Sequence, residues 1–202
     1  FYFHASTVVN RLGWEIEIME TVSDEPFPAP YCEVSSFSWI EPITKVIFSD
    51  IDNPSSADPD TAPAHEDFTD IIGNVNAGET YTFTVEGYTG GNHQNSIRVY
   101  IDWNQDGEFT GADEYYYIGI IENSTGTDGK QATLDIEVPA TALEGNTRMR
   151  VVKKYTSTDP SPNNGCVSGS SFGQAEDYTL NITSDGTTDP DPEPQHCSQG
   201  IP

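Results

Sequence analysis

The sequence predicts an all-β protein, built as an antiparallel β-sandwich of jelly-roll or immunoglobulin-like type with long loops. Short runs in which apolar and polar residues alternate recur along the chain, and such runs are typical of strands with one buried face. Turn-forming residues separate the runs, and no stretch between them shows helical periodicity over more than one turn. About seven short strands separated in this way favour a sandwich.

The alternation is clearest in residues 81–85 and 132–138, where one face is hydrophobic and the other is polar. Residues 53–66 are rich in Pro, Ser, Asp and Ala and show no such pattern, so we expect a long loop there. In chain order, the predicted strands are residues 44–48, 80–88, 96–103, 115–121, 132–138, 148–155 and 177–182.

Five segments are expected along the chain. Residues 1–22 contain two short β-type runs that look like the last strands of a preceding domain, and residues 23–30 form a Pro-rich linker. Residues 31–183 are the sandwich. Residues 184–196 are an acidic Pro-rich linker, and residues 197–202 are the start of a following module. The chain is therefore expected to be a fragment of something longer.

The charge balance limits the partners of the protein. Lys and Arg total 8 against 33 Asp and Glu, a formal charge of -25, which argues against binding nucleic acid or an anionic membrane and favours cations. Aromatic residues make up 11% of the chain, so a folded protein is expected despite the charge. No apolar stretch approaches the length of a membrane span, and direct membrane insertion is not expected.

The stretch from Asp102 to Glu114 predicts a calcium loop. Calcium takes oxygen ligands, and oxygen-bearing side chains at alternate positions can supply them if a glycine, here Gly107, allows a sharp turn. The candidate ligands are the side chains of Asp102, Asn104, Asp106, Asp113 and Glu114 and the backbone carbonyl of Glu108. Zinc is less favoured because the stretch contains no His or Cys.

The loop departs from an EF-hand in two ways. Asp113 stands at the twelfth position, where an EF-hand has glutamate, and Glu114 follows it. The flanking residues 96–101 and 115–121 predict strands rather than helices. An ordinary acidic turn is the alternative interpretation.

The three cysteines are expected to form one disulfide. Cys32 and Cys166 bracket the patterned region, and in the chain-entropy model a bond between them would stabilise the fold by about 5 kcal/mol. Cys197 lies in the Pro-rich tail and is expected to be free or to pair outside this chain.

Glu176 and Asp177 have two interpretations. The pair can hold Arg148 or Arg150, since a buried arginine in so acidic a protein needs a carboxylate. Alternatively, one of them completes a calcium shell, and Glu176 is the better candidate ligand. We favour the structural role.

The aromatic residues are expected mainly to pack. Residues 115–117 are three tyrosines, of which alternate side chains share a face, so one should face the core and two should face outward. They could form a platform for sugars, although packing is the commoner role. Trp14, Trp39 and Trp103 are expected to be packing residues.

Five motifs in order resemble the GEVED domain over residues 31–182. The motif that names the family reads Gly-Gln-Ala-Glu-Asp here, which departs at two positions but keeps the acidic pair. The motifs are Tyr31-Cys32, residues 51–53 with 67–69, residues 100–107, residues 147–151 and residues 173–178. The resemblance implies a secreted β-sandwich of surface proteins and secreted proteases, chiefly in Bacteroidota, without catalytic activity of its own.

The flanks suggest the same context. Residues 1–18 are similar to the last strands of a CUB domain, and residues 197–200 resemble the start of another module. Proteins of this type are commonly exported by the type IX secretion system. A secreted or cell-surface location, attached to the outer membrane, is therefore expected.

The predicted function is that of a non-catalytic, calcium-binding module acting in adhesion or surface architecture. No His-Glu-x-x-His or Gly-x-Ser-x-Gly motif occurs, and the four histidines are scattered. The alternative is an accessory domain that targets a secreted protease or glycosidase to its substrate, or binds carbohydrate. Expected partners are neighbouring domains of the same chain, and surface glycans or host and substratum surfaces.

Overall fold

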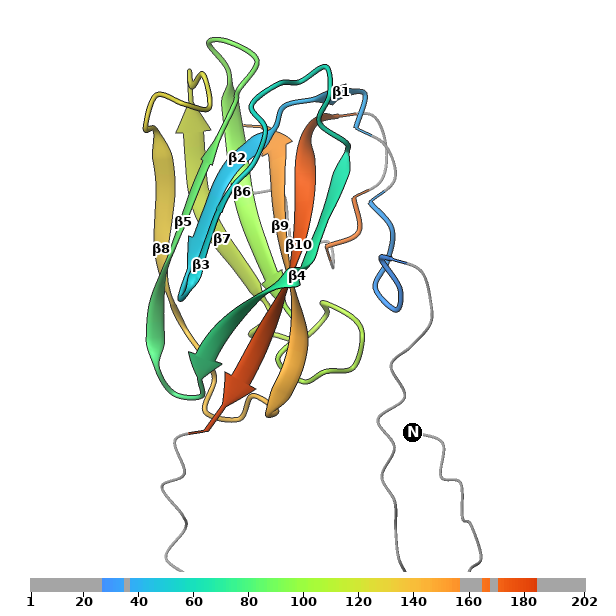
Figure 1. Cartoon of the computed structure of the whole chain (residues 1–202), viewed down its shortest axis with the longest axis vertical. Helices are drawn as coiled ribbons and strands as arrows, with labels where there is room; N and C mark the ends of the chain where they lie inside the picture. Colours follow the sequence, from blue (N-terminus) through green and yellow to red (C-terminus); the bar gives the residue numbers. More distant parts are fainter. Residues whose placement is uncertain (1–26, 35–36, 157–164, 168–170, 185–202) are drawn as a thin grey trace, which may run out of the picture.

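A computed structural model describes residues 27–34, 37–156, 165–167 and 171–184. They form two β-sheets packed face to face, and these ranges contain no helix, which confirms the predicted β-sandwich (Figure 1). The expected segments 1–22 and 197–202, and Trp14 and Cys197 within them, lie outside the described residues. The strands are β1 (Trp39–Ile40), β2 (Ile43–Phe48), β3 (Ile51–Pro54), β4 (His65–Asn76), β5 (Thr80–Gly87), β6 (Gln94–Ile101), β7 (Tyr115–Glu122), β8 (Gln131–Glu137), β9 (Gly145–Tyr155) and β10 (Phe172–Thr183).

The larger sheet has the order β1-β10-β9-β6-β7, with β4 also paired to β10, and the smaller sheet has the order β3-β2-β5-β8. Most pairings are antiparallel, as predicted, but β10 pairs with both β1 and β4 in parallel. This is possible because β10 is long: its first two residues pair with β1, and residues 175–183 pair with β4.

The sequence prediction missed three strands, β1, β3 and β4. The expected loop at residues 53–66 contains the end of β3 and the start of β4. The pairing of β4 with β10 is interrupted between Phe68 and Ile72, where β4 carries three extra residues. A bulge of this kind shifts the side-chain alternation, so β4 has no regular period to detect.

The hydrophobic residues form two clusters. One lies between the sheets, and the other lies on the outer face of the larger sheet, beneath the segments joined by the disulfide. The predicted Cys32–Cys166 disulfide is confirmed, with a Cα–Cα distance of 5.6 Å. The outer cluster contains Val34, Phe37, Tyr100, Phe109, Val152, Val167 and Ala175.

The aromatic predictions were partly wrong. Trp103 is buried and its indole N–H donates a hydrogen bond to the Tyr116 hydroxyl (2.9 Å). Tyr116 packs on the inner core, while Tyr115 packs on the outer cluster, as the alternation of a strand requires. Trp39, however, is 52% exposed and does not pack as expected.

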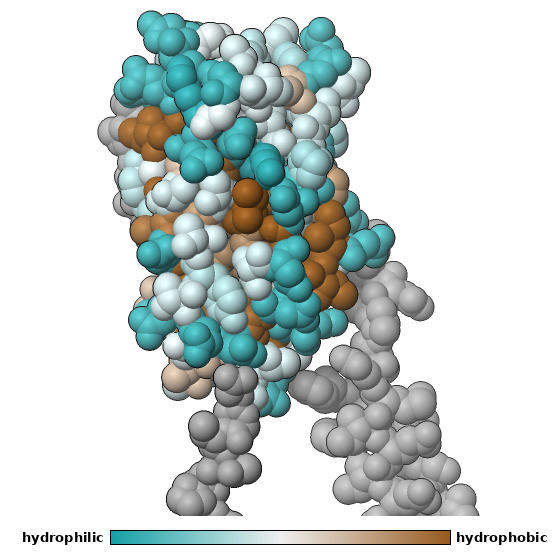
Figure 2. Space-filling view, turned by 60° about the vertical axis from the view of Figure 1, so that its left-hand side comes forward, coloured by the Kyte–Doolittle hydropathy of each residue, from teal (hydrophilic) through white to brown (hydrophobic). Residues whose placement is uncertain are grey.

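The surface is mostly polar on the face that Figure 2 shows. The hydrophobic residues on this face lie in separate small groups. None of the described segments forms a helix with the length and apolar character needed to span a membrane.

Candidate functional site

The acidic loop connects β6 to β7, at the end of the sandwich drawn lowest in Figure 1. Its base is closed by the Ile101 N–H, which donates to the carbonyl of Glu114 (3.0 Å). The Asp102 N–H donates to the carbonyl of Arg148 (3.1 Å) and so continues the pairing of β6 with β9. The prediction that the loop joins two strands is confirmed.

Asp102 is the buried carboxylate at the start of this loop. One of its oxygens accepts the Asp106 N–H (3.2 Å), and the other accepts the Gly107 N–H (3.0 Å) and the Tyr31 hydroxyl (2.7 Å). Burial, followed by the hydrogen bond and charge of Asp102, raises the pKa of Tyr31, so the hydroxyl stays a donor. These hydrogen bonds therefore hold the turn at residues 102–107 around the Asp102 carboxylate.

Asn104 and Asp106 continue the turn. The Asn104 Oδ1 accepts the Asp106 N–H (3.0 Å), and the Asp106 Oδ1 accepts the Glu108 N–H (2.9 Å), the bonding pattern of successive Asx turns. Gly107 has a φ of 84°, which a side chain would disfavour, so the glycine predicted to make the turn does so.

Glu114 is the second buried acid of the loop. Its Oε2 accepts the Gly111 N–H (2.7 Å), and the backbone N–H of Asn104 also interacts with the carboxyl group. Burial raises its pKa, and the charges of Asp102 and Asp106 raise it further. The Glu114 side chain therefore points into the loop.

Two of the candidate ligands have side chains that point to solvent rather than into the loop. The side chains of Asp113 and Glu108 are exposed, so Glu114 rather than the twelfth residue is the acid that turns inward. Asp102 and Glu114 form no ion pair with a lysine or arginine within the described part of the chain. Over those same residues, no group of three or more His, Cys, Asp and Glu side chains is arranged to hold a metal ion.

Glu176 does not join the loop. Its oxygens accept hydrogen bonds from Ser55 Oγ (2.9 Å) and from the Tyr178 hydroxyl (2.7 Å), on the inner face of β10. The register places Glu176 two strands across the sheet and three residues along from the row of Asp102, which separates their Cα atoms by roughly 14 Å. The two side chains are thus in different parts of the fold.

Asp177 holds both arginines, which confirms the structural interpretation for this member of the acidic pair, whereas Glu176 binds no arginine among the described residues. The Arg150 Nε and Nη2 donate to its two oxygens (2.7 and 2.9 Å), and Arg148 Nη1 donates at 2.8 Å. Burial by itself would raise the pKa of Asp177, but hydrogen bonds from Arg150 and His65 and the charge of Arg150 hold it well below its usual range.

The network extends to the disulfide segment. Arg150 Nη1 donates to the carbonyl oxygens of Cys32 (2.8 Å) and Gly165 (3.2 Å). The Arg148 guanidinium lies over the Tyr31 ring, 4.8 Å from its centre. Because Tyr31 also binds Asp102, the segment connects the acidic pair of β10 with the acidic loop. The Tyr31-Cys32 motif was the only signal of this role in the sequence.

The first residues of the family motif have separate structural roles. Gly173 has a φ of 149°, and a Cβ there would lie 2.0 Å from the carbonyl oxygen of Lys153, so only glycine fits. Gln174 is buried, and its side chain accepts the Ile43 N–H (2.7 Å) and donates to the Pro63 carbonyl (2.9 Å). The contact with Ile43 ties β10 to β2 of the smaller sheet.

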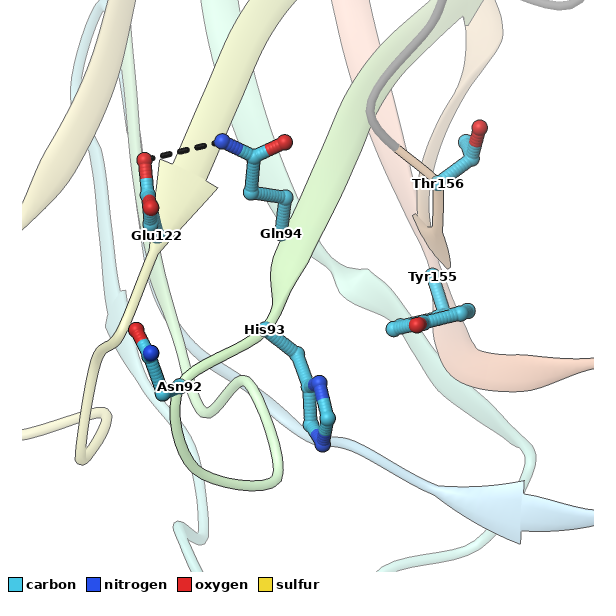
Figure 3. Close-up of a pocket in the computed structure, with 6 residues that line it drawn as sticks. All are labelled: Asn92, His93, Gln94, Glu122, Tyr155 and Thr156. Carbon is cyan, nitrogen blue, oxygen red and sulfur yellow. Dashed lines mark hydrogen bonds between the residues drawn. The ribbon is translucent and has the colours of Figure 1, made fainter.

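A shallow pocket of about 500 Å³ lies at the opposite end of the sandwich from the acidic loop (Figure 3). Tyr155 forms one side of it, with its ring 5.4 Å from His93 and 5.8 Å from Phe172. Across from these aromatics, Gln94 donates a hydrogen bond to Glu122 (2.9 Å). The pocket is lined by Asn92, His93, Gln94, Glu122, Tyr155 and Thr156.

Residues 96–181 match the GEVED domain model. The GEVED match runs from β6 to β10, and therefore includes the acidic loop and the acidic pair. It supports the predicted domain. No curated protein matches the chain.

Proposed function

We propose that this chain supplies a non-catalytic, calcium-binding module to a secreted or cell-surface protein, where it acts in adhesion or surface architecture. The observation that supports calcium is the pairing of two buried carboxylates, Asp102 and Glu114, in one loop without a lysine or arginine partner in the described ranges. Two buried acids that repel each other favour a cation between them.

The loop offers further oxygens to such an ion. The Asn104 and Asp106 side chains lie on the same turn, and the carbonyl of Glu108 follows. Hydrogen bonds of its own Asx turns bend this backbone, so calcium binding would need side-chain adjustment more than refolding. A bound ion would stiffen the connection between β6 and β7, and thereby make the rigidity of the module depend on calcium.

The test is thermal and chemical unfolding of the full chain in millimolar CaCl₂ and in EDTA. A ligand that binds only the native state stabilises it, by about 2.7 kcal/mol at a free concentration one hundred times Kd. We expect this gain with Ca²⁺, less with Mg²⁺, and none for Glu114→Gln. The matched control Asp60→Asn, at an exposed acid outside the loop, should keep it. Equal stability of the wild-type protein in both buffers would refute calcium binding.

The broader context is part of the same proposal. The GEVED match supports a module of this family, and the family resemblance suggests a modular Bacteroidota protein with a preceding CUB-like domain and type IX export. Neighbouring domains of the same chain would be its first partners.

A second candidate function is carbohydrate binding, as an accessory domain of a secreted protease or glycosidase. The pocket of Figure 3 supports it, because Tyr155 and His93 offer aromatic faces beside the polar Gln94–Glu122 pair. A glycan array should then give binding that Tyr155→Ala abolishes and Tyr117→Ala, outside the pocket, retains. Absence of binding by the wild-type protein would exclude this candidate for the glycans tested.

A further inference from the structure

Three polar side chains that play no part in the proposed calcium site meet between the sheets, at the end opposite the acidic loop. Lys153 comes from β9, Asn95 from β6, and Glu41 from the connection between β1 and β2. Lys153 and Asn95 have no exposed surface, and Glu41 is 2% exposed. Buried lysines and glutamates are rare unless they are paired, so this cluster needs an explanation.

The strand register brings the lysine and the asparagine together. Lys153 pairs directly with Ile97, and Asn95 lies two residues from Ile97 on the same face of β6. Lys153 and Asn95 are therefore diagonal neighbours on the inner face of the sheet, within reach of a long side chain. Gly87 leaves space for the lysine, because a Cβ there would lie 2.6 Å from the Lys153 Cε.

Both nitrogens lie close to the Glu41 carboxyl group. The Asn95 Nδ2 donates a hydrogen bond to Glu41 Oε2, and the Lys153 Nζ is 4.0 Å from the same oxygen. The Lys153 Nζ also donates to the backbone carbonyl of Glu41 (2.7 Å). The carboxyl oxygen thus lies between an amine and a primary amide.

The environment favours uncharged groups. Burial lowers the pKa of Lys153 to about 7, although the charge of Glu41 opposes this. Burial raises the pKa of Glu41, against the charge of Lys153 and the hydrogen bond from Asn95. A neutral amine carries the free electron pair that a nucleophile needs. In addition, the Asn95 Oδ1 is buried and has no hydrogen-bond partner in the described structure, so the amide carbonyl is not tied up by another donor.

We propose that Lys153 and Asn95 form an intramolecular amide cross-link, with Glu41 as the proton-transfer group. The Lys153 Nζ attacks the Asn95 Cγ, and a new Nζ–Cγ bond forms. Glu41 starts as the neutral acid, delivers its proton to Nδ2 and takes up the proton that Nζ releases. The Cγ–Nδ2 bond then breaks and ammonia leaves. Glu41 is regenerated, and no oxidant, metal or cofactor is needed.

The product suits its surroundings better than the starting groups. A lysine ammonium has three donors, and the described residues offer the Lys153 Nζ one acceptor within hydrogen-bonding distance. The cross-linked amide has one N–H, which can keep the bond to the Glu41 carbonyl. The reaction thus removes a buried ionisable amine, whose charge is costly in a low-dielectric interior. It also joins β6 covalently to β9.

Mass spectrometry of the full chain tests the proposal. The reduced protein should be lighter than its sequence mass by one ammonia molecule. Succinimide formation at the Asn164-Gly165 pair would remove the same mass, so peptide mapping must follow. Trypsin should release a branched species in which peptide 46–98 is joined to peptide 151–154, because cleavage after a modified Lys153 is blocked.

Variants test the roles of the amine and of the carboxyl group. Lys153→Met keeps the aliphatic stem but has no amine, and Glu41→Gln keeps the shape but cannot transfer the proton, so both should have the full sequence mass. The matched control Lys154→Met, at the next lysine, should still lose ammonia. The wild-type protein used must be disulfide-bonded and must unfold cooperatively. If such protein gives separate linear peptides 46–98 and 151–153, both before and after prolonged incubation, the cross-link is refuted.

Discussion

The two faces of the larger sheet treat neighbouring carboxylates in opposite ways. Glu176 and Asp177 are adjacent in β10, and both are fully buried. On the inner face, Glu176 has the hydroxyl groups of Ser55 and Tyr178 as partners, and burial raises its pKa to about 8. On the outer face, Asp177 has two arginines, and its pKa stays well below the usual range.

The difference shows that burial alone does not set the charge of a group. Desolvation acts on both residues in the same direction, and the partners decide the outcome. The outer face can hold an ionised network because the segment at Cys32 covers it and supplies a carbonyl to Arg150. The inner face packs against the apolar core, so its acid is mostly neutral at pH 7.

The largest effect should come from breaking the outer network. Asp177→Asn would leave Arg148 and Arg150 without their buried carboxylate, at a cost of about 3–5 kcal/mol in the free energy of unfolding. Urea unfolding at pH 7 measures this, with Asp60→Asn as the control at an exposed acid. A loss below about 1 kcal/mol would mean that the arginines find other partners.

Removing the disulfide that holds the Cys32 segment, the cover of the outer network, should have the next largest effect. Replacing Cys32 and Cys166 together by serine should cost about 2–5 kcal/mol, because the bond closes a loop of 134 residues. If the cover protects the outer network, Asp177→Asn should cost less in this background than in the wild-type protein. A double-mutant cycle measures this coupling, and strictly additive losses would show that cover and network are independent.

The buried Glu176 on the inner face should make the free energy of unfolding depend on pH. The pKa of Glu176 is raised in the folded state, so between about pH 4.5 and 8 the folded protein binds more protons at this site than the unfolded chain. Stability from this group therefore falls as pH rises through that window. Glu176→Gln should abolish this part of the slope, about 3–4 kcal/mol between pH 5 and 8, in unfolding curves taken over that range. An unchanged slope would refute the neutral glutamate.

Asp177 should act in the opposite direction. Its pKa is lowered in the folded state, so its contribution is present above pH 4 and is lost as the pH falls further. The fall in the free energy of unfolding below pH 4 should therefore be smaller in Asp177→Asn than in the wild-type protein. Glu176→Gln should leave this fall unchanged. If Glu176→Gln changed the fall below pH 4 and Asp177→Asn changed the slope between pH 5 and 8, the comparison of the two residues would be wrong.

The smallest effect should come from the Tyr31 hydroxyl that binds Asp102, a buried carboxylate outside β10. Tyr31→Phe removes the hydroxyl that donates to Asp102 but keeps the ring that stacks on Phe109, with ring centres 4.8 Å apart. A hydrogen bond to a charged group contributes about 1.5–3 kcal/mol, less where backbone N–H donors remain. In EDTA we expect Tyr31→Phe to lower the free energy of unfolding by an amount near the lower end of this range. No loss at all would show that the Asp106 and Gly107 N–H groups suffice.

The sequence by itself determined the features that depend on local pattern. Alternation revealed β5 and β8, spacing placed the turn at Gly107, and the positions of Cys32 and Cys166 indicated their disulfide. These follow from the period of a strand, the conformational freedom of glycine and the covalent chemistry of thiols, none of which needs knowledge of distant neighbours.

Only the tertiary structure decided the features that depend on which groups the folded chain brings together. The bulge in β4 removed its period, so the parallel pairing with β10 was invisible in sequence. Glu114 rather than Asp113 turned inward because the fold brought Gly111 and Asn104 to its carboxyl group. Glu176 and Asp177 look alike in sequence, yet one is neutral and the other ionised, because electrostatic energy in a low-dielectric interior depends on the few groups within reach.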